Sequence, residues 1–204
     1  MTNLNDLALI GNGTVGALVD GNARIVWACF PRFDGDPTFC SLMRSDRDEA
    51  RDFGHFTIEV ENMVGIAQAY VRNTAVISTV ITDADGGSVE IQDFAPRYRQ
   101  FGRMFAPMML VRQVRPLSGN PRVRIRFRPA TGYGREPMTM KRGSNHITYS
   151  GDDVTLRVTS NAPITAVIEE TMFFLDAPVT ILVGPDETVN EGVVALGRRM
   201  LEAT

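Results

Sequence analysis

The chain has 204 residues, of which 44% are hydrophobic and 22% are charged, and its formal net charge is −3. These values are those of an ordinary globular protein, long enough to bury a sizeable core as one large all-β domain or two small ones. The acidic balance argues against a nucleic-acid partner, because such a partner normally requires a basic face. No stretch approaches the roughly 18 consecutive apolar residues of a membrane helix.

The first residues contain neither a basic nor an apolar segment, so the sequence predicts no signal peptide and a cytoplasmic location. Cys29 and Cys40 are too few for a disulfide scaffold, and no Cys/His cluster has the spacing of a zinc site. Lone cysteines in such a chain are usually small buried hydrophobes. We therefore expect no metal, no cofactor, no nucleic-acid partner and no membrane partner.

Apolar and polar residues alternate along most of the chain, a pattern typical of half-buried antiparallel strands. The clearest case is 122–128, where four arginines alternate with apolar residues. We interpret the arginine face as solvated rather than as a polyanion site. In chain order, strands are predicted over residues 15–19, 23–28, 55–60, 66–71, 76–82, 88–94, 108–114, 122–128, 154–159, 164–169 and 179–183.

Two segments are predicted to be helical. Residues 37–43 fit a short helix after a loop at 31–36, and residues 186–204 fit a longer helix with Asp186 as its N-cap. The pattern as a whole predicts a β-rich domain over residues 1–185, followed by a helix that leads towards another domain. One apolar stripe of the longer helix consists of Val189, Val193, Leu196, Met200 and Leu201.

Residues 11–16, Gly-Asn-Gly-Thr-Val-Gly, match the glycine pattern of dinucleotide-binding folds. That pattern works when the glycines open a helix whose N-terminus receives the pyrophosphate. Only a few apolar residues separate Gly16 from the next predicted strand, so no crossover helix fits. We therefore interpret these glycines as a turn between strands and keep nucleotide binding as a remote alternative.

Side chains suited to catalysis are few. A nucleophile–base centre needs a positioned histidine or an equivalent base. The two histidines, His55 and His146, each open a strand-like run, and we interpret them as surface or edge residues. Glycoside hydrolysis instead needs two carboxylates that flank the scissile bond. The acids in motif-like surroundings are Asp34, Asp36 and Asp93.

The most informative stretch is residues 27–34, Trp-Ala-Cys-Phe-Pro-Arg-Phe-Asp. An aromatic run breaks at a proline, and Arg32 and Asp34 then flank Phe33 on one side of a strand or loop. A cation and an anion beside an aromatic ring are a common way to hold a polyol such as a sugar. A surface salt bridge at a strand end gives the same pattern, and the residues alone leave both interpretations open.

This stretch and several others resemble, in the right order over nearly the whole chain, the N-terminal domain of glycoside hydrolase family 15, the bacterial and archaeal glucoamylases and trehalases. The most specific block is Cys-Phe-Pro-Arg-Phe-Asp at 29–34, after Ile-Val-Trp at 25–27. After Asp34 the family continues with Ser-Pro-Ser, whereas this chain has Gly-Asp-Pro-Thr, which predicts a reshaped loop. Further similar blocks are 7–13, 16–19, 87–97 and 110–134.

The resemblance implies a mainly β fold, an antiparallel β-supersandwich of two packed sheets. Helix 186–204 would be the linker to an (α/α)6 barrel that carries both catalytic glutamates, so this chain inherits no catalytic residue. The implied role is to support the barrel and border its active site, in an enzyme that hydrolyses an α-glucoside with inversion and without a cofactor. Candidates for the rim of that site or for barrel docking are Trp27, Arg32, Phe33, Asp34 and Asp36, with Asp93 and Arg97 as secondary candidates.

A free-standing carbohydrate-binding or protein-interaction module is the alternative. In that hypothesis Trp27, Phe30 and Phe33 form an apolar platform for a sugar face or a protein partner. Apolar surface shaped for a partner also favours self-association. We therefore expect a homo-oligomer, with helix 186–204 as a candidate interface.

Overall fold

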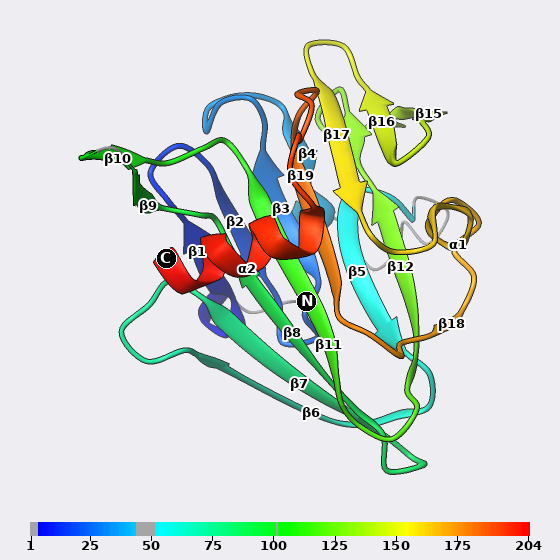
Figure 1. The fold of residues 1–204 in the computed structure, drawn as a ribbon. Coiled ribbons are helices and arrows are strands. Elements are labelled where there is room, and N and C mark those ends of the chain that lie inside the picture. The colour runs from blue at the N-terminus through cyan, green and yellow to red at the C-terminus, as the bar shows by residue number, and fades with distance from the viewer. Residues whose placement is uncertain (1–3, 44–51, 101) are drawn as a thin grey trace.

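The computed structural model describes residues 4–43, 52–100 and 102–204, and it shows two antiparallel sheets packed face to face (Figure 1). The smaller sheet has seven strands in the order β1-β2-β3-β5-β12-β18, with β4 pairing on β3. Its strands are β1 (Ala8–Gly11), β2 (Gly16–Val19), β3 (Ile25–Cys29), β4 (Pro37–Phe39), β5 (His55–Val60), β12 (Arg122–Arg128) and β18 (Phe173–Phe174).

The larger sheet has eight strands in the order β15-β16-β17-β19-β11-β8-β7-β6. Its strands are β6 (Met63–Tyr70), β7 (Ile77–Asp83), β8 (Ser88–Phe94), β11 (Leu110–Ser118), β15 (Thr139–Arg142), β16 (His146–Ser150), β17 (Thr155–Ser160) and β19 (Val179–Pro185). The two-sheet, mainly β architecture is the one predicted.

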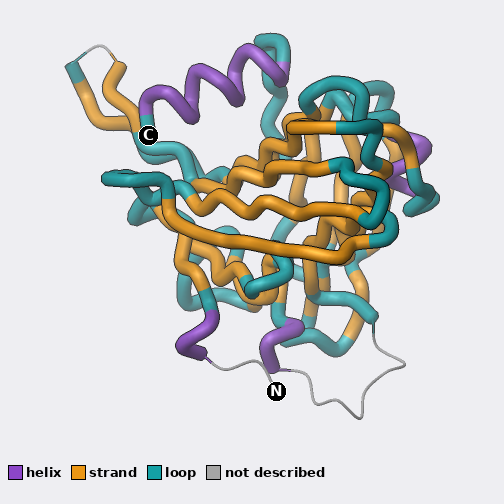
Figure 2. The backbone as a smooth tube through the Cα atoms, turned by 90° about the horizontal axis from the view of Figure 1, so that it is seen from below, coloured by secondary structure: helices purple, strands orange, loops and turns teal. Residues whose placement is uncertain are grey.

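Short elements complete the fold. Figure 2 shows the two 3-10 helices, η1 and η2, on one side of the sandwich and helix α2 on the opposite side. Two small hairpins extend from the sheets. These elements are η1 (Leu4–Asp6), η2 (Ser41–Met43), α1 (Ile164–Ile168), α2 (Val193–Ala203), β9 (Tyr98–Gln100) with β10 (Arg103–Phe105), and β13 (Ala130–Thr131) with β14 (Glu136–Pro137).

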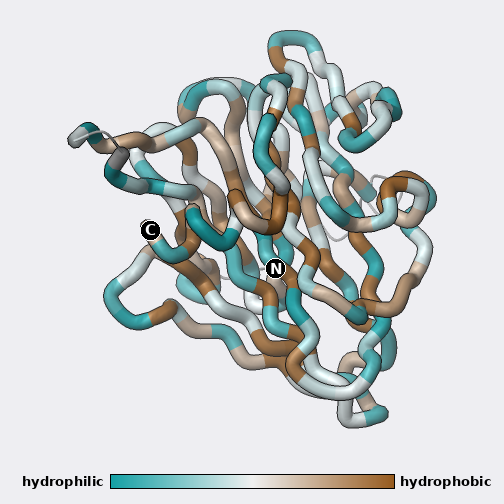
Figure 3. Tube along the Cα trace, viewed as in Figure 1, coloured by the Kyte–Doolittle hydropathy of each residue, from teal (hydrophilic) through white to brown (hydrophobic). Residues whose placement is uncertain are grey.

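The main core lies between the sheets and follows from the alternation in the sequence. Along β12 the apolar residues are buried and the arginines between them are half-buried. Figure 3 shows hydrophobic and hydrophilic residues alternating along the strands in this way. Aromatic rings contact one another at the centre: the Phe127 centroid lies 5.5 Å from that of Phe39 and 4.8 Å from that of Tyr149. Edge-to-face and tilted contacts of this kind favour one arrangement of the core.

A second apolar cluster lies on the outer face of the larger sheet, beneath α2. Leu196 and Met200 of the helix are buried there with Val111 and Leu182 of the sheet. The predicted apolar stripe is confirmed except for Val189, which packs on the same cluster but precedes the helix. The helix begins at Val193 rather than at residue 186, so the predicted start is wrong. Asp186 does not cap it, because its carboxylate accepts a hydrogen bond from Arg157 Nη1 at 2.9 Å instead.

Two other predictions about local structure are wrong. Residues 37–43 form strand β4 and η2 rather than one helix, because Pro37 pairs with Cys29 across a sheet. The predicted strand at 164–169 is the short helix α1. Its β-branched residues favour a strand locally, but the segment forms a short helix that buries Ala166 and Val167.

The remaining predicted strands all fall on observed strands, and 55–60, 88–94 and 122–128 match their observed bounds. Cys29 and Cys40 are both buried, as predicted. Over the described ranges, the helices are all too short or too polar to cross a membrane.

Candidate functional site

The loop at residues 31–36 leaves β3 and returns through a tight turn to β4. The Gly35 amide donates to the Arg32 carbonyl at 3.1 Å. Within the turn, Arg32 Nε and Nη2 donate to the two carboxylate oxygens of Asp34 at 2.8 and 2.7 Å. Their side chains are 74% and 70% exposed, so the pair lies in solvent at the loop tip. The hydrogen bonds from Arg32 hold the pKa of Asp34 below its ordinary value.

Phe33 lies between these two charges and is 58% exposed. Its ring covers Gly16 of β2, where an added Cβ would lie 3.0 Å from Phe33 Cε1. A glycine at this position therefore lets the ring lie flat on the strand. Phe33 is held against the outer face of the smaller sheet and still presents more than half of its surface to solvent.

Three neighbouring strands extend this apolar surface. Leu9, Leu18 and Trp27 face one another across β1, β2 and β3. The residues that alternate with them, such as Ala17 and Ala28, enter the core, so this row points outward. Leu9 is 61% exposed, and Leu18 and Trp27 are half-buried. We call Leu9, Leu18, Trp27 and Phe33 the apolar face; it lies on the smaller sheet, whereas α2 covers the larger one.

Asp36 and the base of the loop border a small cavity. Asp36 Oδ1 accepts a hydrogen bond from the Tyr133 amide at 2.6 Å, which ties the loop to the turn after β13. The cavity has a volume of about 210 Å³, and its wall includes Pro31, Arg32, Asp36, Thr38, Thr131 and Val154. A larger cavity of about 590 Å³ lies beneath α2 and includes none of the candidate residues.

Asp93 lies elsewhere, in the interior. It and Arg112 are each 1% exposed, and Arg112 Nε and Nη2 donate to the Asp93 carboxylate at 2.6 and 2.9 Å. The same guanidinium donates to the carbonyls of Phe56 and Ala23, which belong to the side of the smaller sheet. Its Cζ lies 4.5 Å from the centroid of the Phe56 ring. Asp93 therefore joins the two sheets and cannot reach a surface ligand.

Arg97 is exposed in the segment between β8 and β9. Its amide donates to Thr204 Oγ1 at 3.2 Å, beside the end of α2. The preceding carbonyl, that of Pro96, accepts a hydrogen bond from Asn12 Nδ2 at 2.9 Å. Arg97 thus marks the end of the sandwich at which the β1–β2 turn meets α2.

The glycine pattern at 11–16 joins β1 to β2, with Gly11 opposite Gly16 in an antiparallel hairpin. No helix follows it, which confirms the turn and removes the basis for a dinucleotide site. Asn12 was missed as a structural residue. It is 5% exposed, and its Oδ1 accepts hydrogen bonds from the amides of Thr14 and Val15 at 2.9 and 3.1 Å. Its Nδ2 donates to the carbonyls of Pro96 and Pro107.

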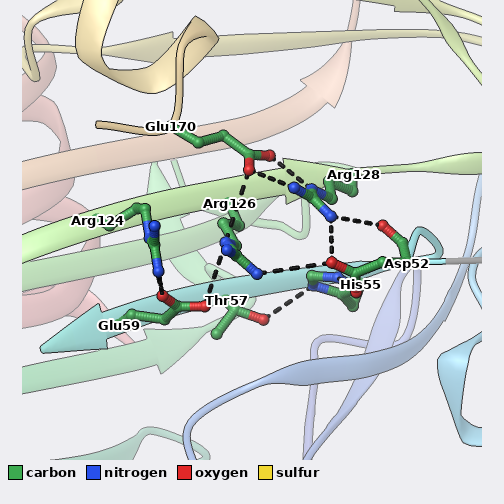
Figure 4. A network of polar contacts seen from close by, with 8 residues as sticks. All are labelled: Asp52, His55, Thr57, Glu59, Arg124, Arg126, Arg128 and Glu170. Atoms are coloured by element: carbon green, nitrogen blue, oxygen red, sulfur yellow. Dashed lines mark hydrogen bonds and ion pairs between the residues drawn. The ribbon is translucent and has the colours of Figure 1, made fainter. Parts of the chain in front are cut away.

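The arginine side of β12 is an ordered charge ladder rather than a freely solvated face (Figure 4). Arg124 Nε donates to Glu59 Oε2 at 2.8 Å, and Arg126 Nε lies 3.2 Å from Glu59 Oε1. Arg128 Nε donates to Glu170 Oε1 at 2.6 Å. Because each arginine has an acidic partner, the ladder offers little free charge to a polyanion.

His55 lies beside this ladder and is 3% exposed, so its interpretation as a surface or edge residue was wrong. Its Nδ1 is 2.9 Å from Thr57 Oγ1 and its Nε2 is 3.1 Å from Asp52 Oδ1. Burial lowers the pKa of His55, and the contact with Asp52 opposes this only in part. The outer face of the smaller sheet thus has two halves, apolar over β1–β3 and charged over β5 and β12.

These features define a class: an antiparallel β-sandwich domain that carries an exposed apolar face and an ion-paired loop on one sheet and a docked helix on the other. Residues 1–185 match the family model described as trehalase-like, N-terminal. The chain belongs to this family of trehalase-like N-terminal domains.

Two curated relatives are similar to the chain. Trehalase 1 of Sulfolobus acidocaldarius is 37% identical over 97 residues, which are 47% of this chain and 16% of that protein. The trehalase of Thermoplasma volcanium is 24% identical over 155 residues, which are 76% of this chain and 24% of that protein. The chain therefore matches at most about a quarter of the length of these relatives.

Proposed function

We propose that this chain is the non-catalytic N-terminal domain of a family 15 glycoside hydrolase of the trehalase or glucoamylase type. The intact enzyme would hydrolyse an α-glucosidic bond with inversion, with water as the nucleophile and without a cofactor. The family match over residues 1–185 carries the proposal. The segment 186–204 would lead to an (α/α)6 barrel, in a cytoplasmic enzyme.

Neither Asp34 nor Asp93 suits the role of the catalytic acid. A glycosidase needs a carboxylic acid that holds its proton near neutral pH. Asp34 instead loses its proton more readily than an ordinary carboxyl group, because hydrogen bonds from Arg32 lower its pKa. Burial raises the pKa of Asp93, but both of its oxygens bind Arg112 in the interior. The catalytic acid, and with it the carboxylate that must flank the same bond, is therefore expected on the barrel.

The apolar face is the surface on which we place the barrel. Exposed apolar patches on a folded domain commonly mark interaction sites. Phe33 and Trp27 would bury their exposed area against the barrel, and Arg32, Asp34 and Asp36 would lie at the edge of that contact. Charged side chains at such an edge can hydrogen-bond the hydroxyl groups of a sugar. This supports a loop that both docks the barrel and borders its active site.

The test is glucose release from trehalose, maltose and isomaltose by this chain, by a separately produced family 15 barrel, and by their mixture. We expect activity in the mixture that exceeds the activity of the barrel, and none from this chain. Hydrolysis by this chain alone would overturn the proposal. A mixture no more active than the barrel would also contradict it.

Variants then locate the contribution. Arg32→Ala and Asp34→Ala are expected to raise KM or lower kcat of the mixture at an unchanged unfolding midpoint of the chain. Phe33→Ala is expected to weaken association. Leu117→Ala is the matched control, because Leu117 is 46% exposed on the larger sheet, away from the apolar face. If the control lowers activity as much as the loop variants, the loop has no special role.

A carbohydrate-binding module is the second candidate, and the cavity of about 210 Å³ beside Arg32 and Asp36 favours it. Phe30 does not belong to the platform, because it is 1% exposed and enters the core. Trp27 and Phe33 remain on the surface. Calorimetric titration of the chain with glucose and trehalose tests this function: heat that saturates and is lost in Asp36→Ala supports it, and silence at millimolar sugar contradicts it.

A further inference from the structure

Among the described residues, the end strands β18, β15 and β1 each carry a feature that discourages pairing with another chain. Such features include short length, charge and cover. Strand β18 has two residues, and β15 carries Lys141 and Arg142. At the β1 edge, the Tyr70 hydroxyl accepts from the Leu9 amide at 2.7 Å and donates to the Leu9 carbonyl at 2.9 Å. These groups of Leu9 are thereby satisfied.

Strand β6 has none of these features. It has eight residues, pairs among the described residues with β7 alone, and forms the outer border of the larger sheet in Figure 1. Its sequence, Met-Val-Gly-Ile-Ala-Gln-Ala-Tyr, contains no charge and no proline. Val64 is 68% exposed and Ile66 is 38% exposed. An exposed, uncharged edge of this length is a template for strand addition.

The register shows which backbone groups of β6 are free. The Val71 amide donates to the Val76 carbonyl at 2.9 Å, next to the Tyr70–Ile77 pair of the ladder. Because hydrogen-bonded residues alternate in an antiparallel ladder, Ala69 and Ala67 also direct their amides and carbonyls to β7. The intervening residues 66, 68 and 70 direct theirs away from the sheet.

We propose that β6 pairs antiparallel with β6 of a second copy of this chain, so that two larger sheets join into one continuous sheet. A two-fold axis near Ala67 places this small residue opposite its own copy, Ile66 opposite Gln68, and Val64 opposite Tyr70. Exposed apolar side chains then meet across the axis and no like charges face each other. The strand is uncharged and, about this axis, complementary to itself, which favours a second copy of the chain as the partner.

This interface differs from the one expected at residues 186–204. The apolar stripe of α2 is already buried against the larger sheet, so the helix has little apolar surface left for a partner. The β6 pairing also does not depend on the proposed glycosidase role, since no residue of β6 belongs to the apolar face. Failure of either proposal therefore leaves the other standing.

Sedimentation of the 204-residue chain from low to high micromolar concentration tests the pairing. We expect a reversible dimer. Ala67→Lys places two ammonium groups opposite each other and is expected to give a monomer. Because Ala67 is exposed, its unfolding midpoint is expected to equal that of the wild-type chain at a concentration low enough for the wild type to be monomeric. Ala69→Lys gives a second variant on the same face. Val194→Lys is the matched control, on α2 at 42% exposure, and is expected to remain dimeric.

Amide hydrogen exchange provides a second measurement at the residue level. In the dimer, the amides of residues 66, 68 and 70 are expected to be protected, and in Ala67→Lys they are expected to exchange rapidly. The amides of residues 67, 69 and 71 should stay protected in both proteins. A wild-type chain that is monomeric throughout, a dimer that survives Ala67→Lys, or a dimer that only Val194→Lys dissociates would each overturn the inference.

Discussion

Arg112 and Asp93 show how a single buried pair can organise a large sandwich. Two opposite charges in the interior must offset a large loss of hydration, which needs good geometry and further hydrogen bonds. Arg112 has both, because it meets Asp93 with two nitrogens and two carbonyls of the other sheet with the remaining donors. The signal for this pair in the sequence was a single arginine, Arg112, directly after the apolar residues 108–111 of a predicted strand.

Asp93→Ala is expected to lower the free energy of unfolding by about 3–5 kcal/mol, because it leaves the Arg112 charge buried without a partner. The double variant Asp93→Leu with Arg112→Met removes both charges and is expected to recover most of that loss. Urea unfolding monitored by circular dichroism measures both values. A double variant that is as unstable as Asp93→Ala would contradict this account.

His55 is expected to make the stability depend on pH. Burial lowers its pKa in the folded state, so below the ordinary value of 6.5 the unfolded chain binds a proton that the folded chain does not. The His55 contribution is therefore present above that pH and is lost as the pH falls below it. Urea unfolding at several pH values between about 5 and 8 measures the slope. His55→Gln is expected to flatten it, and an unchanged slope would contradict the assignment.

At the scale of elements, α2 lies unusually close to β19. A Cβ on Gly197 would lie 2.5 Å from Thr180 Cγ2 and 3.0 Å from Gln113 Nε2. Glycine therefore brings the helix backbone down onto the strand, which lets Leu196 and Met200 reach the cluster beneath it. The periodic stripe of the sequence predicted this helix and its buried face. Its start could not be predicted, because the Asp186 side chain that suggested an N-cap binds Arg157 of another strand.

Gly197→Ala is expected to lower the free energy of unfolding by about 1–3 kcal/mol, because crowding in a packed contact outweighs the gain of roughly 1 kcal/mol in helix propensity. Gly192→Ala is the matched control, since nothing lies within 4 Å of its added Cβ. Thermal and urea unfolding compare the two variants. If Gly197→Ala is stabilising, the helix is less tightly docked than the structure shows.

At the scale of the whole molecule, strand pairing divides the outer face of the smaller sheet into its apolar half and its charged half. Leu9, Leu18 and Trp27 lie on three successive strands and meet only because β1, β2 and β3 pair in one register. The sequence pointed to Trp27 and Phe33 through their own motif but gave no sign of the two leucines. Alternation predicts which residues share a face of one strand, whereas the neighbours on adjacent strands depend on long-range register.

Trp27 is the single tryptophan of the chain and lies on the apolar face, so its fluorescence tests the proposed docking of the barrel. We expect its emission to shift to shorter wavelength when a tryptophan-free family 15 barrel variant is added, because half-exposed indole becomes buried. Phe33→Asp is expected to abolish the shift, and Leu117→Asp on the other sheet to preserve it. A shift lost equally in both variants would place docking elsewhere.

The buried pair between the sheets also bears on how sequences of this family can diverge. Replacing Asp93 or Arg112 alone passes through a strongly destabilised intermediate, whereas replacing both restores a neutral interior. The two positions should therefore change together in homologues, either both charged or both apolar. Position 23 accepts the guanidinium through its main-chain carbonyl, so that hydrogen bond does not depend on the side chain there. Position 56 accepts through its carbonyl as well, but its ring also packs on the guanidinium and is expected to vary with the pair.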